Sequence, residues 1–273
     1  MSKNTNDLNS RSGAGVRMAK ISGLVITFNE EKHIEACLKS LFQVCDDVVV
    51  VDSCSTDKTV QIAQSLGATV LVQPFLGDGP QRIYGLPSCK HDWILNLDAD
   101  ERLEEDCIQT IKNLALDTEE HDVFEIRRNN LIGNRMTPYA GQYPDYVARL
   151  FNKPTANFSP VRAHTRVSGV NHQKLDCHIK HYSYKNWSDL FSRQCKYAHW
   201  MGEEYAKAGK HIPSYAPFCH ATWSFTRHYI VKLGFMAGLD GLSISIAKAI
   251  GAYLKYAYAI ELMRNKNDQN TLS

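Results

Sequence analysis

The sequence predicts an α/β protein built on a mostly parallel sheet. Apolar runs typical of strands alternate with segments whose apolar residues recur at the spacing of one helical face. The run at residues 47–52, DVVVVD, is continuously apolar between two acids, as expected of a strand covered on both faces. Because parallel strands need a crossover connection, usually a helix, the repeated strand–helix order predicts a doubly wound sheet.

The first half of the chain supplies the parallel strands. They are expected at residues 21–28, 46–52, 68–73 and 92–98. The helices between them are expected at residues 30–42, 55–67 and 79–89. The helix at 55–67 has capping residues at its start and Gly67 at its end, which are the usual boundary signals.

The second half predicts an addition to this sheet and then a helical segment. After a helix at residues 104–115, short alternating runs between residues 122 and 182 predict an added mixed sheet. Residues 186–209 have the pattern of a long amphipathic helix. We expect a polar, disordered tail at 1–18, an α/β domain at 19–212 and a helical segment at 213–273.

Composition excludes several classes of protein. A formal net charge of +2 gives no reason to expect a nucleic-acid partner. The eight cysteines form no C-x-x-C pair, which favours free thiols in a reducing cytosol over a zinc ribbon or a disulfide-rich secreted domain. The N-terminal residues lack the apolar core of a signal peptide. No stretch reaches the roughly 18 uncharged apolar residues expected of a membrane-spanning helix.

Polar clusters follow three of the expected parallel strands, at residues 27–30, 52–57 and 98–100. In an open α/β sheet, ligands bind outside the carboxyl ends of the strands. Asp98 and Asp100 therefore predict a site for Mg²⁺ or Mn²⁺, which take carboxylate and phosphate oxygens. The alternative is a turn in which an aspartate caps the next helix.

Asp52 ends its strand, whereas Ser55 or Thr56 can cap the helix that follows. Its carboxylate can accept hydrogen bonds from a base N–H or a ribose hydroxyl. The sequence has no G-x-G-x-x-G after the first strand and no Walker lysine. This argues against dinucleotide-dependent dehydrogenases and P-loop enzymes.

Four segments together resemble family 2 glycosyltransferases, which have the GT-A fold: VITFNEEKHIEACLKSL, DDVVVVDSCSTDKTVQIAQSLGATV, GPQRIYGLPSCKHDWILNLDADERL and YPDYVARLF. The resemblance covers residues 20–260, with the motifs in the family's order. The short length, the YPDYVARLF segment and the helical tail are similar to bacterial lipopolysaccharide core glucosyltransferases. Those enzymes transfer glucose from UDP-glucose to an inner-core heptose in a β-1,4 linkage.

The resemblance implies a donor site. Thr27, Phe28 and Glu30 would line the pyrimidine and ribose pocket, Asp52 would hydrogen-bond the uracil, and Arg82 would lie near the donor.

The resemblance also implies the chemistry. Asp98 would lie by the ribose, and Asp98 and Asp100 would hold the metal–diphosphate. An inverting single displacement needs one carboxylate base, and Asp145 is the expected one. The alternative for Asp145 is a turn residue after Pro144. Arg149 would face phosphate or pair with an acid inside the fold.

Three of the histidines after the YPDYVARLF segment are candidate site residues. Related enzymes often have Val-His-Glu after the YPDYVARLF segment, but here SPVRAHTRVSG offers His164 without the glutamate, which leaves the acceptor sugar open. His178 and His181 follow on the next strand, and His181 is the expected additional metal ligand. The alternative for His181 is a structural role.

The helical tail carries a positive excess. Between residues 220 and 266 there are six lysines or arginines and two acids, and Lys248 and Lys255 share a helical face. Such a helix is typical of segments that lie on an anionic membrane surface. The alternative is that it packs on the domain or on another subunit. Gly234, Gly238 and Gly241 predict a helix break or close packing. The tail thus predicts a cytoplasmic protein that is peripheral on the inner face of the membrane, which fits the lipid-linked saccharide acceptor that the resemblance implies.

Two other functions fit the sequence less well. A sugar nucleotidylyltransferase needs a glycine-rich, arginine-containing loop after the first strand, where this chain has TFNEEKH. A non-catalytic saccharide-binding protein has no use for the pair Asp98 and Asp100, because acids at a strand end cost stability. The expected function is therefore an inverting, metal-dependent glycosyltransferase with a nucleotide-sugar donor.

Overall fold

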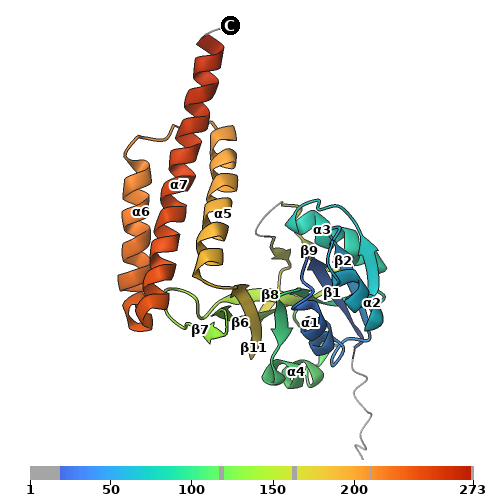
Figure 1. Cartoon of the computed structure of the whole chain (residues 1–273). Coiled ribbons are helices and arrows are strands. Elements are labelled where there is room, and N and C mark those ends of the chain that lie inside the picture. The colour runs from blue at the N-terminus through green and yellow to red at the C-terminus, as the bar shows by residue number, and fades with distance from the viewer. Residues whose placement is uncertain (1–18, 117–119, 162–164, 210, 272–273) are drawn as a thin grey trace, which may run out of the picture.

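The computed structural model describes residues 19–116, 120–161, 165–209 and 211–271. The tail expected to be disordered, residues 1–18, and His164 lie outside the described residues. The chain forms an α/β part and, beside it, a bundle of three helices (Figure 1).

Parallel strands form the first half of the sheet. They are β1 (Ile21–Thr27), β2 (Asp47–Asp52), β3 (Thr69–Val72) and β4 (Trp93–Asp98), in the spatial order β3-β2-β1-β4. The connecting helices are α1 (Ile34–Leu41), α2 (Thr59–Ser65) and α3 (Asp78–Gly85), the last followed by a 3₁₀ turn at Leu86–Ser88. The predicted strand–helix order is thus confirmed, and the carboxyl ends of β1, β2 and β4 lie side by side.

The expected additional strands continue the same sheet instead of forming a separate one. Next to β4 come β8 (Tyr146–Asn152), β6 (Val123–Ile132), β11 (His172–Tyr184) and β5 (Glu101–Leu103), with β7 (Arg135–Met136) paired to β6. The result is a nine-stranded sheet in which β8 runs antiparallel to β4, so the predicted mixed character is confirmed. Helix α4 (Glu105–Lys112) follows β5, and β9 (Asn157–Phe158) pairs with β10 (Val167–Ser168) apart from this sheet.

Core side chains on both faces of the sheet explain the continuous apolar run of β2. Val48 and Val50 pack with α1 and α4 in one cluster, whereas Val49 and Val51 pack with Phe151 and neighbouring residues in another. Successive side chains of a strand point to opposite faces. A strand buried on both sides therefore needs an apolar residue at every position.

The bundle consists of α5 (Trp187–Lys207), α6 (Ala216–Thr226) and α7 (Gly238–Thr271). Both α5 and α6 pack along α7, so α5 lies with the helical segment although the sequence placed it within residues 19–212 (Figure 1). A π turn (Arg227–Val231) and a 3₁₀ turn (Gly234–Ala237) connect α6 to α7. The helix break expected from the glycines is therefore present, with Gly238 at φ +55°.

The residues from Gly234 to Asn265 are long and apolar enough to cross a membrane by length and composition. This differs from the sequence expectation, which admitted no charged residue in such a stretch. Only 22% of its most apolar window is buried in the fold. Core helices of other proteins meet the same criterion, so the finding shows only that this length and composition are present.

Close packing at Gly241 leads to a stability prediction. A Cβ at Gly241 would lie 1.9 Å from the Gly234 carbonyl oxygen, whereas the nearest atom to a Cβ at Gly251 in the same helix is Gln194 Oε1, at 3.3 Å. We expect Gly241→Ala to lower the free energy of unfolding by about 1–3 kcal/mol through overpacking. Gly251→Ala should leave it unchanged or raise it, because alanine favours the helix. Urea unfolding of both variants tests this, and equal effects would contradict the packing argument.

Candidate active site

The sheet brings the predicted strand-end residues together. Thr27 pairs with Asp52 across β1 and β2, and Ile26 pairs with Asp98 across β1 and β4. The polar clusters after these strands therefore line one edge, as parallel strands require. This edge holds the donor and metal residues expected from the sequence.

Asp98 lies between two arginines. Its Oδ2 accepts from Arg149 Nη2 at 2.7 Å, and its Oδ1 accepts from Arg82 Nη2. Burial alone would raise the pKa of Asp98, but the charges of Arg149 and Arg82 outweigh it and hold the pKa well below its ordinary value. With both oxygens engaged, Asp98 would have to lose an arginine before it could bind a metal directly.

Glu101 is a buried member of this cluster that the sequence reasoning did not single out. It is 1% exposed, and its Oε1 accepts from Arg149 Nη2 at 2.5 Å. Its Oε2 accepts from the Asp98 backbone N–H at 3.0 Å. Arg149 is thus a paired, buried arginine, one of the two alternatives expected for it. The sequence feature that could have identified Glu101 is an acid at an inward-facing position directly after the pair Asp98 and Asp100.

Removing the Glu101 charge should destabilise the fold. We expect Glu101→Gln to cost about 3–5 kcal/mol, because Arg149 would remain buried with its charge only partly compensated. The control is Glu35→Gln, whose partner Lys39 is 61% exposed and whose ion pair lies on the surface of α1. That change should cost less than about 0.5 kcal/mol. Similar unfolding midpoints for the two variants in urea would contradict the assignment.

Asp100 and His181 face one another beside this cluster. Asp100 Oδ1 lies 3.7 Å from His181 Nε2, and both side chains are mostly buried. Burial raises the pKa of Asp100 to about 6, and the charges of Asp98 and Glu101 act in the same direction. Asp100 thus lacks the close arginine partners that Asp98 has.

Asn130 orients His181. Asn130 Nδ2 donates to Asp145 Oδ2 at 2.9 Å and to the Gln142 carbonyl oxygen at 3.0 Å, so its Oδ1 faces His181. His181 Nδ1 lies 2.7 Å from this Oδ1, which only accepts, so Nδ1 carries the proton. In the neutral ring the Nε2 lone pair then faces Asp100. This is the arrangement of a metal-ligating histidine whose other nitrogen is held by a second group.

The residues present fit a divalent cation. Asp100 offers an under-compensated carboxylate and His181 offers an oriented ring nitrogen, and Mg²⁺ or Mn²⁺ binds such groups together with substrate phosphates. Direct ligation by Asp100 and His181 stays a prediction, as does that by Asp98.

Asp145, the expected base, joins the same network. Its Oδ2 accepts from Arg128 Nη2 at 2.7 Å, from Arg128 Nε at 3.0 Å and from Asn130 at 2.9 Å. Among the described residues no hydrogen bond reaches its Oδ1. Burial alone would raise the pKa of Asp145, but Arg128 and Asn130 lower it below its ordinary value. Asp145 is therefore ionised and oriented, with one oxygen available to take a proton.

The remaining donor-site residues differ in accessibility. Thr27 is buried and its Oγ1 has no partner among the described residues, whereas Phe28 is 55% exposed beside it. Burial raises the pKa of Glu30, partly offset by Lys185 and Arg193. Their roles toward a donor stay predictions.

Asp52 and Arg82 are more enclosed than the sequence suggested. Asp52 is fully buried, and both its carboxylate oxygens accept hydrogen bonds from Ser55. The Ser55 backbone N–H donates to Oδ2 at 2.8 Å, and the Ser55 Oγ donates to Oδ1 at 2.5 Å. A bond from Asp52 to uracil would have to replace one of these. Arg82 reaches Asp98 from α3 and also contacts Asp78.

A second set of possible metal ligands lies apart from this edge. Ligand atoms of Glu104, Asp106 and His178 lie within 4.8 Å of one another. His178 already uses both ring nitrogens, with Asp106 Oδ2 at 2.6 Å and Tyr143 Oη at 3.2 Å. His178 and His181 are three residues apart on β11, so their side chains point to opposite faces.

Comparison with known proteins agrees with this geometry. Residues 22–170 match the sequence profile described as Glycosyl transferase family 2. This is over half of the 273 residues, and the chain belongs to glycosyl transferase family 2. It is therefore an enzyme of the glycosyltransferase class, and the predicted α/β architecture with its C-terminal helices is confirmed.

Particular relatives are similar over different parts of the chain. An uncharacterized glycosyltransferase of Rickettsia bellii (strain RML369-C) is 32% identical over 89% of this chain and 87% of its own length. The lipopolysaccharide core biosynthesis glycosyltransferase LpsC of Rhizobium meliloti (strain 1021) is 33% identical over 43% of this chain and 46% of its own. The crystal structure of S. aureus TarS 1–349 is 18% identical, covers 90% of this chain and 92% of that one, and has a TM-score of 0.45.

Proposed function

We propose that this enzyme is an inverting, metal-dependent glycosyltransferase that moves glucose from UDP-glucose to a lipopolysaccharide core saccharide. Within the same family, another donor or another glycan or lipid acceptor is the alternative. Part of the sequence is similar to LpsC, named for lipopolysaccharide core biosynthesis, and this favours the core saccharide.

One observation carries the proposal: Asn130 joins the expected metal ligand and the expected base in one network. It bonds His181 on one side and Asp145 on the other, while His181 faces Asp100. A group held at Asp100 and a hydroxyl held at Asp145 would thus meet at one place. Positioning of both reactants is what a single displacement requires.

The side chains then divide the reaction between them. Asp145 Oδ1 would accept the proton of the attacking hydroxyl, while Arg128 and Asn130 hold Oδ2 in place. Arg82 and Arg149 keep Asp98 ionised at the donor edge. A divalent cation, when bound, would neutralise negative charge on the leaving diphosphate. Attack from the face opposite the nucleotide would convert an α-linked donor into a β-linked product.

The turn between α6 and α7 supports a membrane-bound acceptor. Six large apolar side chains are exposed in this turn and at the start of α7, and we call them the apolar tip: Ile230, Val231, Leu233, Phe235, Met236 and Leu239. From residue 215 to 239 the sequence has no acid, while Arg227 and Lys232 are exposed. Apolar groups flanked by cations suit the surface of an anionic bilayer.

The tip, and not the helical face expected from the sequence, is the better candidate for membrane contact. Lys248 is largely buried, which lowers its pKa, and the charge of Asp145 acts on it. Lys255 Nζ lies over the rings of Tyr205 and Tyr256. Because α7 packs along α5, which carries charged residues such as Glu203 and Lys207, a bilayer around α7 would also have to desolvate those charges. A peripheral position on the cytoplasmic leaflet fits these contacts.

A transfer assay tests the proposal. The purified protein is incubated with radiolabelled UDP-glucose, Mg²⁺ or Mn²⁺, and a deacylated lipopolysaccharide core acceptor. We expect labelled acceptor with a β linkage, measured by chromatography and NMR. If labelled product forms with another UDP-sugar and not with UDP-glucose, that UDP-sugar replaces UDP-glucose as the assigned donor. No transfer and no UDP release with any of several UDP-sugars would overturn the proposal.

A further inference from the structure

A cavity lies where the α/β part meets the helical bundle. Its volume is about 640 Å³, within the range of small-molecule sites. Residues from five places line it: the end of β6, the end of β11, the β7 hairpin, the start of α5 and the start of α7. The expected metal ligands, the expected base and the expected donor-site residues are not among the residues that line it.

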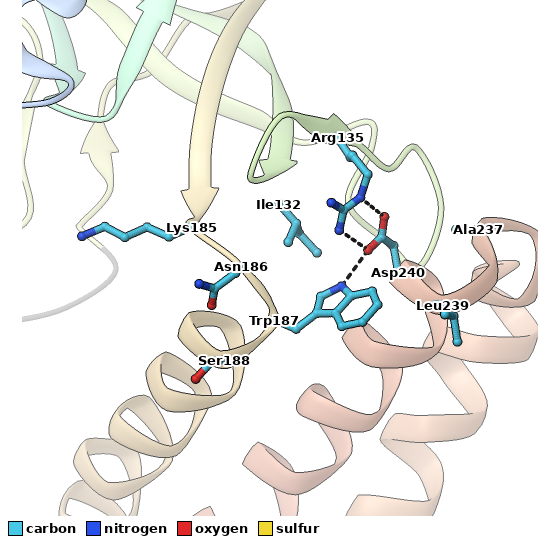
Figure 2. Close-up of a pocket in the computed structure, with 9 residues that line it drawn as sticks. All are labelled: Ile132, Arg135, Lys185, Asn186, Trp187, Ser188, Ala237, Leu239 and Asp240. Atoms are coloured by element: carbon cyan, nitrogen blue, oxygen red, sulfur yellow. Dashed lines mark hydrogen bonds and ion pairs between the residues drawn. The ribbon is translucent and has the colours of Figure 1, made fainter.

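The cavity contains an ordered set of recognition groups (Figure 2). Asp240 accepts two hydrogen bonds from Arg135, each at 2.8 Å, and one from Trp187 Nε1 at 2.7 Å. The Arg135 guanidinium lies 5.8 Å from the Trp187 ring centre. The indole is thus fixed in orientation while its side chain stays 38% exposed. A fixed aromatic plane beside charged and amide groups is suited to a ligand with both apolar and hydroxylated surface.

Two strands lead from the candidate active site to this cavity. On β6, Ile132 lines the cavity two residues after Asn130, and Lys185, the first residue after β11, follows His181 by four residues. At about 3.3 Å per strand residue these separations are about 7 Å on β6 and at most about 13 Å along β11, so a ligand reaching both places must be larger than one sugar ring. Figure 2 shows Lys185 extending away from Arg135 and Asp240. Its charge acts to lower the pKa of Glu30 at the donor edge.

The cavity also borders the apolar tip. Leu239 belongs to both, and Ala237 lines the cavity within the same turn. Arg135 and Asp240 neutralise one another as an ion pair, and Lys185 at the edge of the cavity adds one positive charge. A saccharide bearing a carboxylate or phosphate, attached to a lipid at the tip, would match both features.

We propose that this cavity, centred on Trp187, binds the part of the acceptor saccharide that lies beyond the reacting sugar. This inference rests on the proposed function for the presence of a lipid-linked acceptor. Trp187 would contact a sugar ring, and Arg135, Asp240 and Asn186 would contact its hydroxyl and acidic groups. The acceptor would enter from the membrane side and extend along β6 and β11 to Asp145.

Saturation-transfer NMR with deacylated lipopolysaccharide core oligosaccharide, on the full chain, tests the cavity directly. We expect signal transfer to the sugar protons in the wild type and a loss of affinity of at least tenfold in Trp187→Ala. Leu239→Glu, which adds an acid to an exposed wall residue, should weaken binding without disturbing the core. Trp200→Ala is the matched control, because Trp200 is 42% exposed on the same helix and does not line the cavity.

The outcomes separate this inference from the proposed function. Binding of the oligosaccharide to the wild type that both cavity variants weaken supports the cavity, whatever the transfer assay shows. No binding to the wild type, or equal affinity in all variants, overturns it. Calorimetric titration of UDP with Mn²⁺ reports the donor site separately. If the protein binds UDP and transfers glucose, but Trp187→Ala leaves its affinity for the oligosaccharide unchanged, only the cavity assignment is refuted.

Discussion

The substitution Asp145→Asn is expected to lower the rate constant of sugar transfer by about 10²–10⁴-fold, the usual contribution of a positioned base. Asparagine keeps the shape of the side chain but cannot take the proton of the attacking hydroxyl. Because Asp145 is not placed at the nucleotide, the dissociation constant of UDP should change little. Steady-state transfer kinetics and UDP titration on the same variant measure the two effects.

Arg128→Gln distinguishes a base from a merely structural aspartate. Arg128 lowers the pKa of Asp145, so its removal should raise that pKa. Activity requires ionised Asp145, and the acidic limb of the rate profile should therefore move to higher pH. If Asp145 only pairs with Arg128, both variants will lose stability while the pH profile of the remaining activity stays where it was. That result would exclude Asp145 as the base.

The second large effect is expected from Asp100→Asn, which should abolish metal-dependent transfer and yet stabilise the metal-free protein. The folded-state pKa of about 6 lies above the ordinary value of 3.8, so the metal-free fold loses stability as pH rises through this window. The loss is complete above that window and amounts to about 3 kcal/mol. Asparagine carries no charge and avoids the loss, so the variant should be more stable near pH 7.5 and equal to the wild type near pH 4.

Unfolding in urea with EDTA or with Mn²⁺ measures these effects. Mn²⁺ should stabilise the wild type by mass action and leave Asp100→Asn unchanged. Asp98→Asn is the matched control two residues away. The pKa of Asp98 is lowered by Arg149 and Arg82, so its contribution is present at neutral pH and is lost as pH falls. Asp98→Asn should therefore destabilise at neutral pH. Stabilisation of Asp100→Asn by Mn²⁺ would refute the metal assignment.

The parallel half of the sheet and its acidic edge follow from the sequence. Strand and helix patterns repeat within short segments, and the edge at which parallel strands end is fixed by their direction. Asp98 and Asp100 could therefore be placed at a ligand edge before any contact was known. The alternation also predicted the mixed strands after residue 122, although not that they continue the same sheet, because their pairing partners are distant in sequence.

The division of labour between Asp98 and Asp100 was decided by tertiary structure. Asp98 is neutralised by Arg82, 16 residues before it, and by Arg149, 51 residues after it. Asp100 meets His181, which Asn130 orients. No local pattern distinguishes the two aspartates, since each partner arrives on a different element of the fold.

The helical segment shows the same limit. Sequence periodicity placed Lys248 and Lys255 on one helical face, but whether that face meets water, a membrane or another helix depends on what packs against it. The contacts of α5 and α6 with α7 cover it and leave the apolar tip exposed instead. The sequence by itself determined which residues share a strand end or a helix face. Only the tertiary structure decided their partners, because burial and pairing depend on segments far apart in the chain.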